Sequence, residues 1–392
     1  MATELTTDRL RALAETRSPE GKVLSVFINL DPHEVPTPAA RATEIRAVLD
    51  AAARQVRDHD ALTDAERTAL TADVERVRTH LGGAGAEEMT GGARGLAVFA
   101  SEPAALFEVI ALPRAVAPEV RIAERPAVST IARLASTDPW WVLLVDRRHA
   151  RLLCGTVAGL VEHWRTEDAV AGHHDQGPSK ARDQGGTSHE HHQRSAEKDV
   201  DDHLRGVAAE LRRLLDDEPC AGILLGGAAD ITGQIRDLLA PELARQVQGQ
   251  IDVEVWTASP AQVLQAATPE LRRIEQEHDA ALLARISDAI GTGKGAAGLG
   301  PVLDALNERR VGTIVVATGT RARGVRCGGC GWLAISASGT CGACGTMTDG
   351  VDDIVEEAVA RALALGASAH VLPRADDDLL SQHDGVVAGL RF

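Results

Sequence analysis

Four of the six cysteines stand in two short motifs near the C-terminus. Cys327-Gly-Gly-Cys330-Gly and Cys341-Gly-Ala-Cys344-Gly each place two thiols three positions apart and follow them with a glycine. At this spacing two thiolates reach one ion, and two such turns complete a tetrahedral set of four sulfur ligands, which is typical of structural zinc. A closed four-thiolate site leaves no position for a reacting water, so we expect a zinc that stabilises a ribbon without taking part in catalysis. The alternative is four free cysteines.

A second stretch with chemical potential is the polar run 171–205, which shows no apolar period before about Ser195. It contains the adjacent pair Gly185 and Gly186, and two glycines allow a backbone to enter a crowded site where a Cβ would clash. Long polar loops inside compact chains are usually functional or disordered, and composition alone leaves both interpretations open. From Ser195 the apolar spacing predicts a helix.

Other candidate motifs are weaker. His189-Glu190 begins like the helical zinc motif of metalloproteases, but Gln193 stands where the second histidine is required, so the spacing argues against a catalytic metal. The glycine-rich segment 291–300 fits a phosphate-binding pattern only on paper, because it follows a helix, and we expect a hinge. Asp146 and His149, in a predicted hairpin turn, have no recognisable nucleophile partner.

Composition bounds the class of protein. The chain has 392 residues, a formal net charge of -16 and 44% hydrophobic residues, enough for two to four domains with buried cores. The acidic balance argues against a protein that coats nucleic acid non-specifically, and DNA is not an expected partner. No apolar run resembles a signal peptide or a membrane span, so we expect a cytoplasmic protein with no membrane partner, in which clustered cysteines indicate metal rather than disulfides.

Apolar periodicity predicts an α/β protein of three domains, at residues 1–136, 137–257 and 258–392. The middle domain is expected to be a mixed-sheet α/β domain carrying the glycine-rich loop, and the last an α/β domain carrying the zinc ribbon. The expected elements include strands at 23–30, 95–100, 106–112, 140–146, 150–154, 220–227, 251–256, 312–317 and 369–373, a helix capped by Thr63-x-x-Glu66, and a long helix over 259–290.

With these features together, the chain resembles the archaeo-eukaryotic class-one translation termination factors and Pelota, and is most similar to their bacterial branch, which includes the ribosome hibernation factor Balon. The resemblance rests on the glycine pair in a loop after a hairpin and on Arg194 and Arg205 at the start of the following helix. It rests further on AGILLGGAAD at 221–230, VLDALNERRVGTIVVA at 302–317 and the final GVVAGLRF. It spans most of the chain from Trp140 onward and is weaker before that.

The resemblance implies a tRNA-shaped factor that occupies the A site of the 70S ribosome, with the loop directed at the peptidyl transferase centre. It also implies contact with ribosomal RNA and elongation factor Tu as a partner. The residues so implied are Gln184, Gly185, Gly186, Thr187 and Ser188 in the loop, and Lys180, Arg182 and Arg194 as local phosphate contacts.

Two departures from the family pattern bear on activity. Thr187 stands where the family has the glutamine that positions a water at the ester of peptidyl-tRNA, and the N-terminal part lacks the family's stop-codon motifs. The sequence therefore favours a ribosome-binding hibernation or rescue factor that reads no stop codon and has no assigned catalytic residue. One alternative is a peptidyl-tRNA hydrolase of the ribosome quality-control type, in which Thr187, Ser188 or the backbone positions the water. Another is an unrelated α/β zinc protein with a disordered loop.

Overall fold

The computed structural model describes residues 3–18, 21–32, 34–82, 93–112, 114–132, 139–156, 159–167, 187–215, 220–336, 339–373 and 379–392, with only the backbone described at 3–4, 7, 156 and 187–196. These residues form two compact units. Residues 1–136 and 277–392 make one unit, and residues 137–276 make the other. The division into three domains is not tested by this grouping and stays a prediction.

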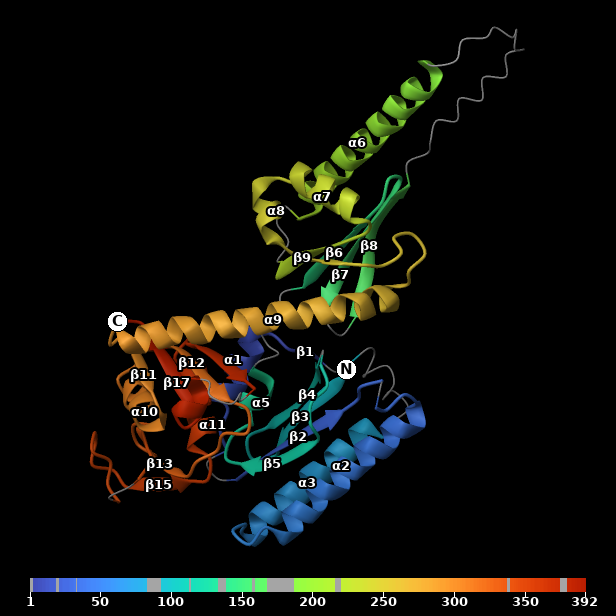
Figure 1. Ribbon diagram of the computed structural model, residues 1–392. Coiled ribbons are helices and arrows are strands. Elements are labelled where there is room, and N and C mark those ends of the chain that lie inside the picture. The colour runs from blue at the N-terminus through green and yellow to red at the C-terminus, as the bar shows by residue number, and fades with distance from the viewer. Residues whose placement is uncertain are drawn as a thin grey trace. The chain divides into compact units, whose positions relative to one another are not determined.

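A five-stranded sheet in the order β1-β4-β3-β2-β5 forms the N-terminal part of the first unit. Its elements are β1 (Thr3–Glu4), α1 (Thr7–Glu15), β2 (Val23–Asn29), α2 (Pro38–Asp58), α3 (Asp64–Leu81), β3 (Gly95–Ser101), β4 (Leu106–Leu112), β5 (Glu119–Ala123) and α5 (Ser129–Ala132). Strand β2 is buried along its whole length because both faces of the sheet are covered. Leu24, Val26 and Ile28 pack against α2 and α3, which lie side by side on one face (Figure 1).

The C-terminal part of this unit is a four-stranded sheet in the order β11-β17-β12-β16 with a small three-stranded sheet attached. Its elements are β11 (Gly295–Ala297), α10 (Leu299–Asn307), β12 (Val311–Ala317), β13 (Gly324–Cys327), β14 (Leu333–Ala334), β15 (Thr348–Val351), α11 (Ile354–Ala364), β16 (Ser368–Leu372), α12 (Leu379–Gln382) and β17 (Val386–Leu390). Alternation along β12 sends Ile314 and Val316 to one face and Val315 to the other, so this sheet also has two covered faces.

One hydrophobic core joins the two parts of this unit. Leu10 and Leu13 of α1 and Ile131 of α5 belong to the same buried cluster as Val355 and Val359 of α11. The first and last segments of the chain therefore share a core, although the whole of the second unit separates them in the sequence.

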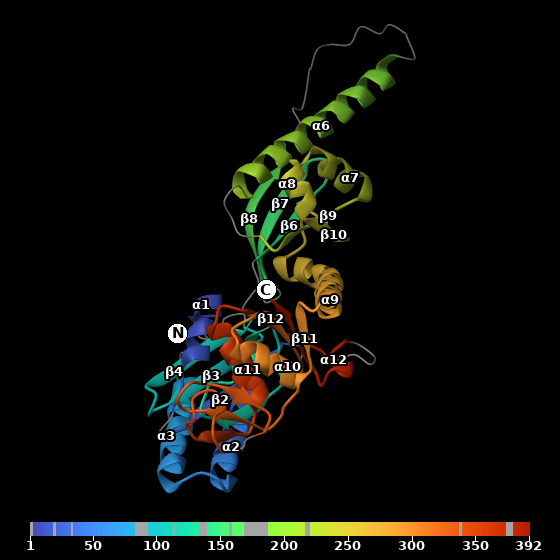
Figure 2. The same cartoon turned by 90° about the vertical axis from the view of Figure 1, so that its left-hand side faces the viewer.

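The second unit is a five-stranded mixed sheet in the order β10-β9-β6-β7-β8. Its elements are β6 (Trp140–Val145), β7 (His149–Thr156), β8 (Gly159–Glu167), α6 (Thr187–Leu215), β9 (Gly222–Gly226), α7 (Ala229–Leu238), α8 (Pro241–Gln246), β10 (Val247–Ile251) and the first half of α9 (Pro260–Gly291). Trp141, Leu143 and Val145 pack with α6, α7 and α8, whereas the alternate residues of β6 pack with α9. Figure 2 shows α6 running past the sheet, so its first turns project from the unit.

The predicted α/β class is confirmed, but three elements differ from expectation. Helix α6 begins at Thr187, well before Ser195. The expected hinge at 291–300 instead contains β11 and the start of α10. The expected strand at 251–256 is wrong, because the strand is β10, over Val247–Ile251. The polar sequence of β10, interrupted by a register shift before Gly249, hides its strand character. Among the described residues, no helix is both long and apolar enough to cross a lipid bilayer.

Candidate functional site

The four cysteines of the two predicted motifs meet in one cluster. The Sγ atoms of Cys327 and Cys344 lie 3.4 Å apart, those of Cys330 and Cys341 lie 3.5 Å apart, and all four lie within 4.8 Å of one another. Cys327 and Cys341 are buried, whereas Cys330 and Cys344 are exposed. Four thiols at these distances can surround one ion, so the predicted metal-binding arrangement is present.

The two cysteine turns repeat one backbone geometry. Gly331 N–H donates to Cys327 O and Gly345 N–H donates to Cys341 O, both at 2.9 Å. Each glycine has a positive φ, +73° for Gly331 and +76° for Gly345, a conformation that a side chain disfavours. The glycine after each cysteine pair therefore closes the turn that presents the thiols, as the spacing predicted.

The other strands of the small sheet hold the first cysteine turn, Cys327–Cys330, against the rest of the unit. β13 pairs with both β14 and β15, and Cys327 is its last residue. Asn307, at the end of α10, donates from Nδ2 to Leu333 O at 2.8 Å and accepts from Leu333 N–H at 2.9 Å. This two-point bond anchors β14, and with it the turn that holds Cys327 and Cys330.

Two of the four cysteine thiols have pKa values that are shifted in opposite directions. Hydrogen bonding with the side chain and backbone of Thr346 lowers the pKa of Cys344 to about 6. The Trp332 N–H lowers the pKa of Cys330, but hydrogen bonding to Cys344 and Cys341, together with desolvation, outweighs it and raises the pKa to about 12. Because cysteine binds metal ions as the thiolate, an ion that fills the site would release protons, so metal affinity and pH are linked.

The structure describes only part of the predicted loop segment. Lys180, Arg182, Gln184, Gly185 and Gly186 lie outside the described residues. Thr187, Ser188 and Arg194 belong to the first turns of α6, where only the backbone is described. Their proposed contacts therefore stay predictions.

The C-terminal half of α6 packs firmly against the sheet of the second unit. Leu204, Val207, Leu211 and Leu215 are buried in the core of the second unit at helical spacing. The glycine pair thus directly precedes, in the sequence, a helix whose later turns are fixed to the sheet.

A cluster that sequence reasoning missed holds the loop after β10. The guanidinium of Arg151, 4% exposed, donates to the carbonyls of Val255 at 2.9 Å and Ala258 at 2.8 Å, and forms an ion pair with Glu162. Arg165 stacks on Trp256, 4.1 Å from the ring centroid. These contacts join residues far apart in the sequence, so spacing gave no signal for them.

The predicted turn residues Asp146 and His149 lie beside this cluster. Asp146 Oδ2 lies 3.0 Å from His149 Nδ1, and the imidazole stacks on Trp256 with centroids 4.5 Å apart. Burial raises the pKa of Asp146, but hydrogen bonds from Arg148 N–H and from His149 outweigh it and lower the pKa. Asp146 and His149 therefore stabilise the hairpin turn, Asp146 by its contact with the imidazole and His149 by stacking on Trp256.

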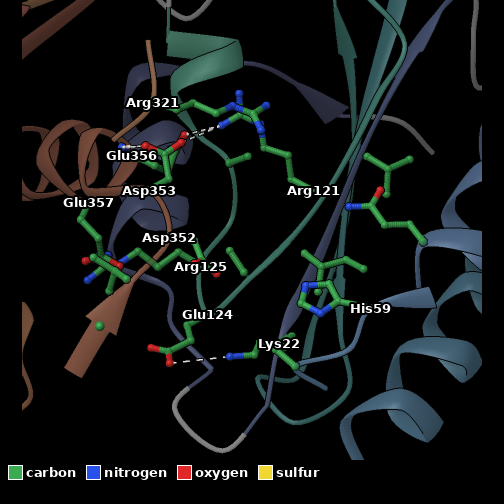
Figure 3. A pocket seen from close by; sticks show the side chains of 18 residues that line it. Lys22, His59, Arg121, Glu124, Arg125, Arg321, Asp352, Asp353, Glu356 and Glu357 are labelled. Atoms are coloured by element: carbon green, nitrogen blue, oxygen red, sulfur yellow. Dashed lines mark hydrogen bonds and ion pairs between the residues drawn. The ribbon is translucent and has the colours of Figure 1, made fainter. Parts of the chain in front are cut away.

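A crevice of about 260 Å³ lies in the first unit, lined by charged residues of β5 and of the N-terminal end of α11 (Figure 3). Arg121 forms ion pairs with Glu356 at 3.3 Å and Asp353 at 3.6 Å, and Arg125 pairs with Glu357 at 2.9 Å. Burial raises the pKa of Glu356, and the Ser129 hydroxyl and Arg121 oppose this rise. Because these charges pair across the crevice, we interpret it as the seam between the two parts of the unit rather than as a substrate site.

The fold and the cysteine cluster define a multi-sheet α/β protein with a four-cysteine site in its C-terminal part that could hold a metal ion. Residues 126–272 match the model of bacterial archaeo-eukaryotic release factor family 10, so the predicted resemblance to the bacterial release-factor branch is confirmed over the middle of the chain. The match covers all of the second unit except its last residues and includes the glycine pair and α6. The likeness to the hibernation factor itself stays a prediction. No curated protein matches the sequence.

Several solved structures are similar at low sequence identity. An archaeal translation termination factor, aRF1, is 17% identical over 99% of both chains, with a TM-score of 0.27. Archaeoglobus fulgidus Pelota is 14% identical over 76% of this chain and 79% of its own, with a TM-score of 0.38. Saccharomyces cerevisiae Dom34, a translation termination-like factor involved in RNA quality control, is 10% identical over 73% of this chain and 74% of its own, with a TM-score of 0.39.

Proposed function

We propose that this protein is a ribosome-binding hibernation or rescue factor. It would occupy the A site of the 70S ribosome in the cytoplasm and direct the Gly185–Gly186 loop at the peptidyl transferase centre, without reading a stop codon. The observation that carries the proposal is the release-factor family match over residues 126–272, which includes this loop. Elongation factor Tu is the proposed protein partner.

The described part of the second unit supports this use of the loop. The first turns of α6 project from the unit, and the buried leucines of its later turns fix the helix to the sheet (Figure 1). A rigid helix that begins directly after two glycines suits a backbone that must enter a narrow space, because neither glycine brings a Cβ. Arg182, Lys180 and Arg194 are the proposed phosphate contacts, which position the loop without carrying sequence information.

The formal charge of -16 places a condition on this proposal. A ribosome binder with so much acid cannot rely on bulk attraction to phosphate, since that requires clustered lysine and arginine. Binding must then be led by shape, with few cationic contacts. We therefore expect the affinity for the ribosome to depend only weakly on salt concentration.

The cysteine cluster is proposed to hold structural zinc. Cys327, Cys330, Cys341 and Cys344 supply four sulfur ligands, the set that tetrahedral zinc prefers, and no ligand position remains for water. When bound, zinc would crosslink the two turns and stabilise the small sheet of β13, β14 and β15.

One observation supports a second candidate function. Thr187 and Ser188 place two hydroxyls directly after the glycine pair. A hydroxyl or backbone group that positions water there would make the protein a peptidyl-tRNA hydrolase of the ribosome quality-control type. The side chain of Thr187 is shorter than the glutamine of the family pattern, so the binding function is favoured.

Stalled 70S ribosomes that carry labelled peptidyl-tRNA separate the two functions. Purified protein is incubated with them, and co-sedimentation and peptide release are scored in the same sample. We expect binding without release, and weaker binding for Gly185→Ala and Gly186→Ala. Gly233→Ala is the matched control, because Gly233 lies in α7 with nothing within 4 Å of an added Cβ.

Peptide release that disappears in Thr187→Ala would support the hydrolase instead. If the protein neither sediments with ribosomes nor releases peptide, both functions are wrong.

A further inference from the structure

An arginine of α11 lies against the first cysteine turn. A Cβ built on Gly331, the residue after Cys330, would lie 3.3 Å from Arg361 Nη1 and 3.8 Å from its Cζ. The guanidinium therefore covers the one residue of this turn that has a positive φ and no side chain. Any larger residue at position 331 would displace it.

Within the described part of the chain Arg361 has no acidic partner, in contrast to Arg121, Arg125 and Arg326. Arg121 and Arg125 each form an ion pair with a carboxylate of α11, and Arg326 lies 3.9 Å from Glu357. Among the residues that the structure describes, none forms an ion pair with Arg361, and no atom accepts a hydrogen bond from its buried Nε.

An uncompensated cation in a partly buried place costs free energy unless an anion faces it. Burial lowers the pKa of Arg361, and the positive charges of Arg309 and Arg125 add to this effect. A negative charge on Cys330 acts in the opposite direction, so the guanidinium lies within electrostatic reach of the cysteine cluster.

The metal-loaded cluster supplies the missing negative charge. Four thiolates and one divalent ion carry a net charge of about -2, and residues that surround ligands commonly tune metal affinity through charge and hydrogen bonds. Two of the ligands, Cys330 and Cys344, are exposed, so part of this charge lies near the surface. A guanidinium over the turn of Cys330 is placed to offset it.

We propose that Arg361 is a positioning residue of the metal centre, which stabilises the loaded four-thiolate cluster by offsetting its negative charge. The proposal rests on the proposed zinc site. It assigns to α11, an element outside both cysteine motifs, a part in how tightly the ion is held.

Zinc affinity tests this assignment. The full-length protein and its variants are titrated with zinc in competition with a chromogenic chelator at fixed pH. We expect Arg361→Met and Arg361→Gln to raise the zinc Kd by about 10-fold or more, as is typical when a residue behind the ligands is lost. Arg361→Lys, which keeps the charge but loses the planar fork, should stay within about threefold of wild type.

Arg236→Met is the matched control, because Arg236 lies on an exposed face of α7 in the other unit. Thermal melts of the metal-loaded proteins identify any variant that fails to fold, and Arg361→Gln, which retains a polar side chain, then replaces Arg361→Met. Zinc bound equally by wild type, Arg361→Met and Arg361→Gln would overturn the assignment and leave the zinc site standing. Wild-type protein that binds no zinc would overturn both.

Discussion

At the scale of single residues, the contacts that matter most are those that hold irregular backbone in place. Arg151 satisfies two carbonyls of the loop between β10 and α9, a segment without ladder partners of its own. A buried carbonyl without a donor costs free energy comparable to a lost hydrogen bond. A single guanidinium thus supplies the hydrogen bonds that these loop carbonyls would otherwise receive from regular secondary structure.

Removing this guanidinium should destabilise the second unit. We expect Arg151→Met to lower the free energy of unfolding by about 2–4 kcal/mol, because two loop carbonyls and Glu162 lose their buried partner. Arg165→Met is the control: Arg165 also pairs with Glu162, but its side chain is 48% exposed, and the expected loss is below about 1 kcal/mol. Urea unfolding followed by far-UV circular dichroism measures both. Equal losses in the two variants would show that the loop does not depend on Arg151.

The cysteines set a second residue-scale expectation, the pH dependence of metal binding. Zinc needs all four ligands as thiolates, and the pKa of Cys330 is raised to about 12, so its proton must leave on loading. Lowering the pH therefore weakens zinc binding, with the Kd rising about tenfold per pH unit for each proton released. Chelator competition between pH 6 and pH 8 measures the slope. A Kd that does not change over this range would contradict thiolate ligation.

At the scale of elements, one glycine determines where strand β9 ends. Gly227 has a φ of +131°, and a Cβ there would lie 2.2 Å from Val145 O of the neighbouring strand. The backbone must turn at this point to lead from β9 into α7. Any other residue would meet both a strained conformation and a backbone clash.

Two glycines of the same strand–helix unit should respond in opposite ways to alanine. Gly227→Ala should cost about 2–4 kcal/mol through strain and overpacking. Gly233→Ala lies in the interior of α7 with open space around it, and should stabilise by about 0.5–1 kcal/mol because alanine favours helix. Thermal melts of the two variants give the sign directly. A stabilised Gly227→Ala would mean that β9 does not end as described.

The sequence predicted those elements and sites whose signal is local. The cysteine turns are predicted by four cysteines at a fixed spacing and by the glycine after each pair, and β6 is predicted by an unbroken apolar run. The sequence does not predict the first turns of α6, from Thr187, because they carry no apolar stripe, and it does not predict β10 because that strand is mostly polar. The roles of Arg151 and Arg361 could not be predicted, since each depends on tertiary contacts that no spacing encodes.

At the scale of the whole molecule, the first unit is built from both ends of the chain. Leu10 and Leu13 of α1 pack in one core with Val355 and Val359 of α11. The paired charges of Arg121, Arg125, Glu356 and Glu357 line the seam beside this core (Figure 3). Residues 1–136 alone would expose the apolar side of that core and lose the α11 carboxylates that pair with Arg121 and Arg125.

We therefore expect residues 1–136 not to fold in isolation, whereas residues 137–276 should fold. Each buried leucine contributes about 1.5–3 kcal/mol, so losing several exceeds the 5–15 kcal/mol that typically stabilises a domain. The second unit keeps its own cores on both faces of its sheet. Each fragment is expressed separately, and its cooperative thermal transition and amide dispersion are measured. As the control, a flexible linker replaces residues 137–276 in the full chain, which should restore the shared core and with it a cooperative transition. A cooperative transition for residues 1–136 alone would show that the shared core is an interface between independent domains.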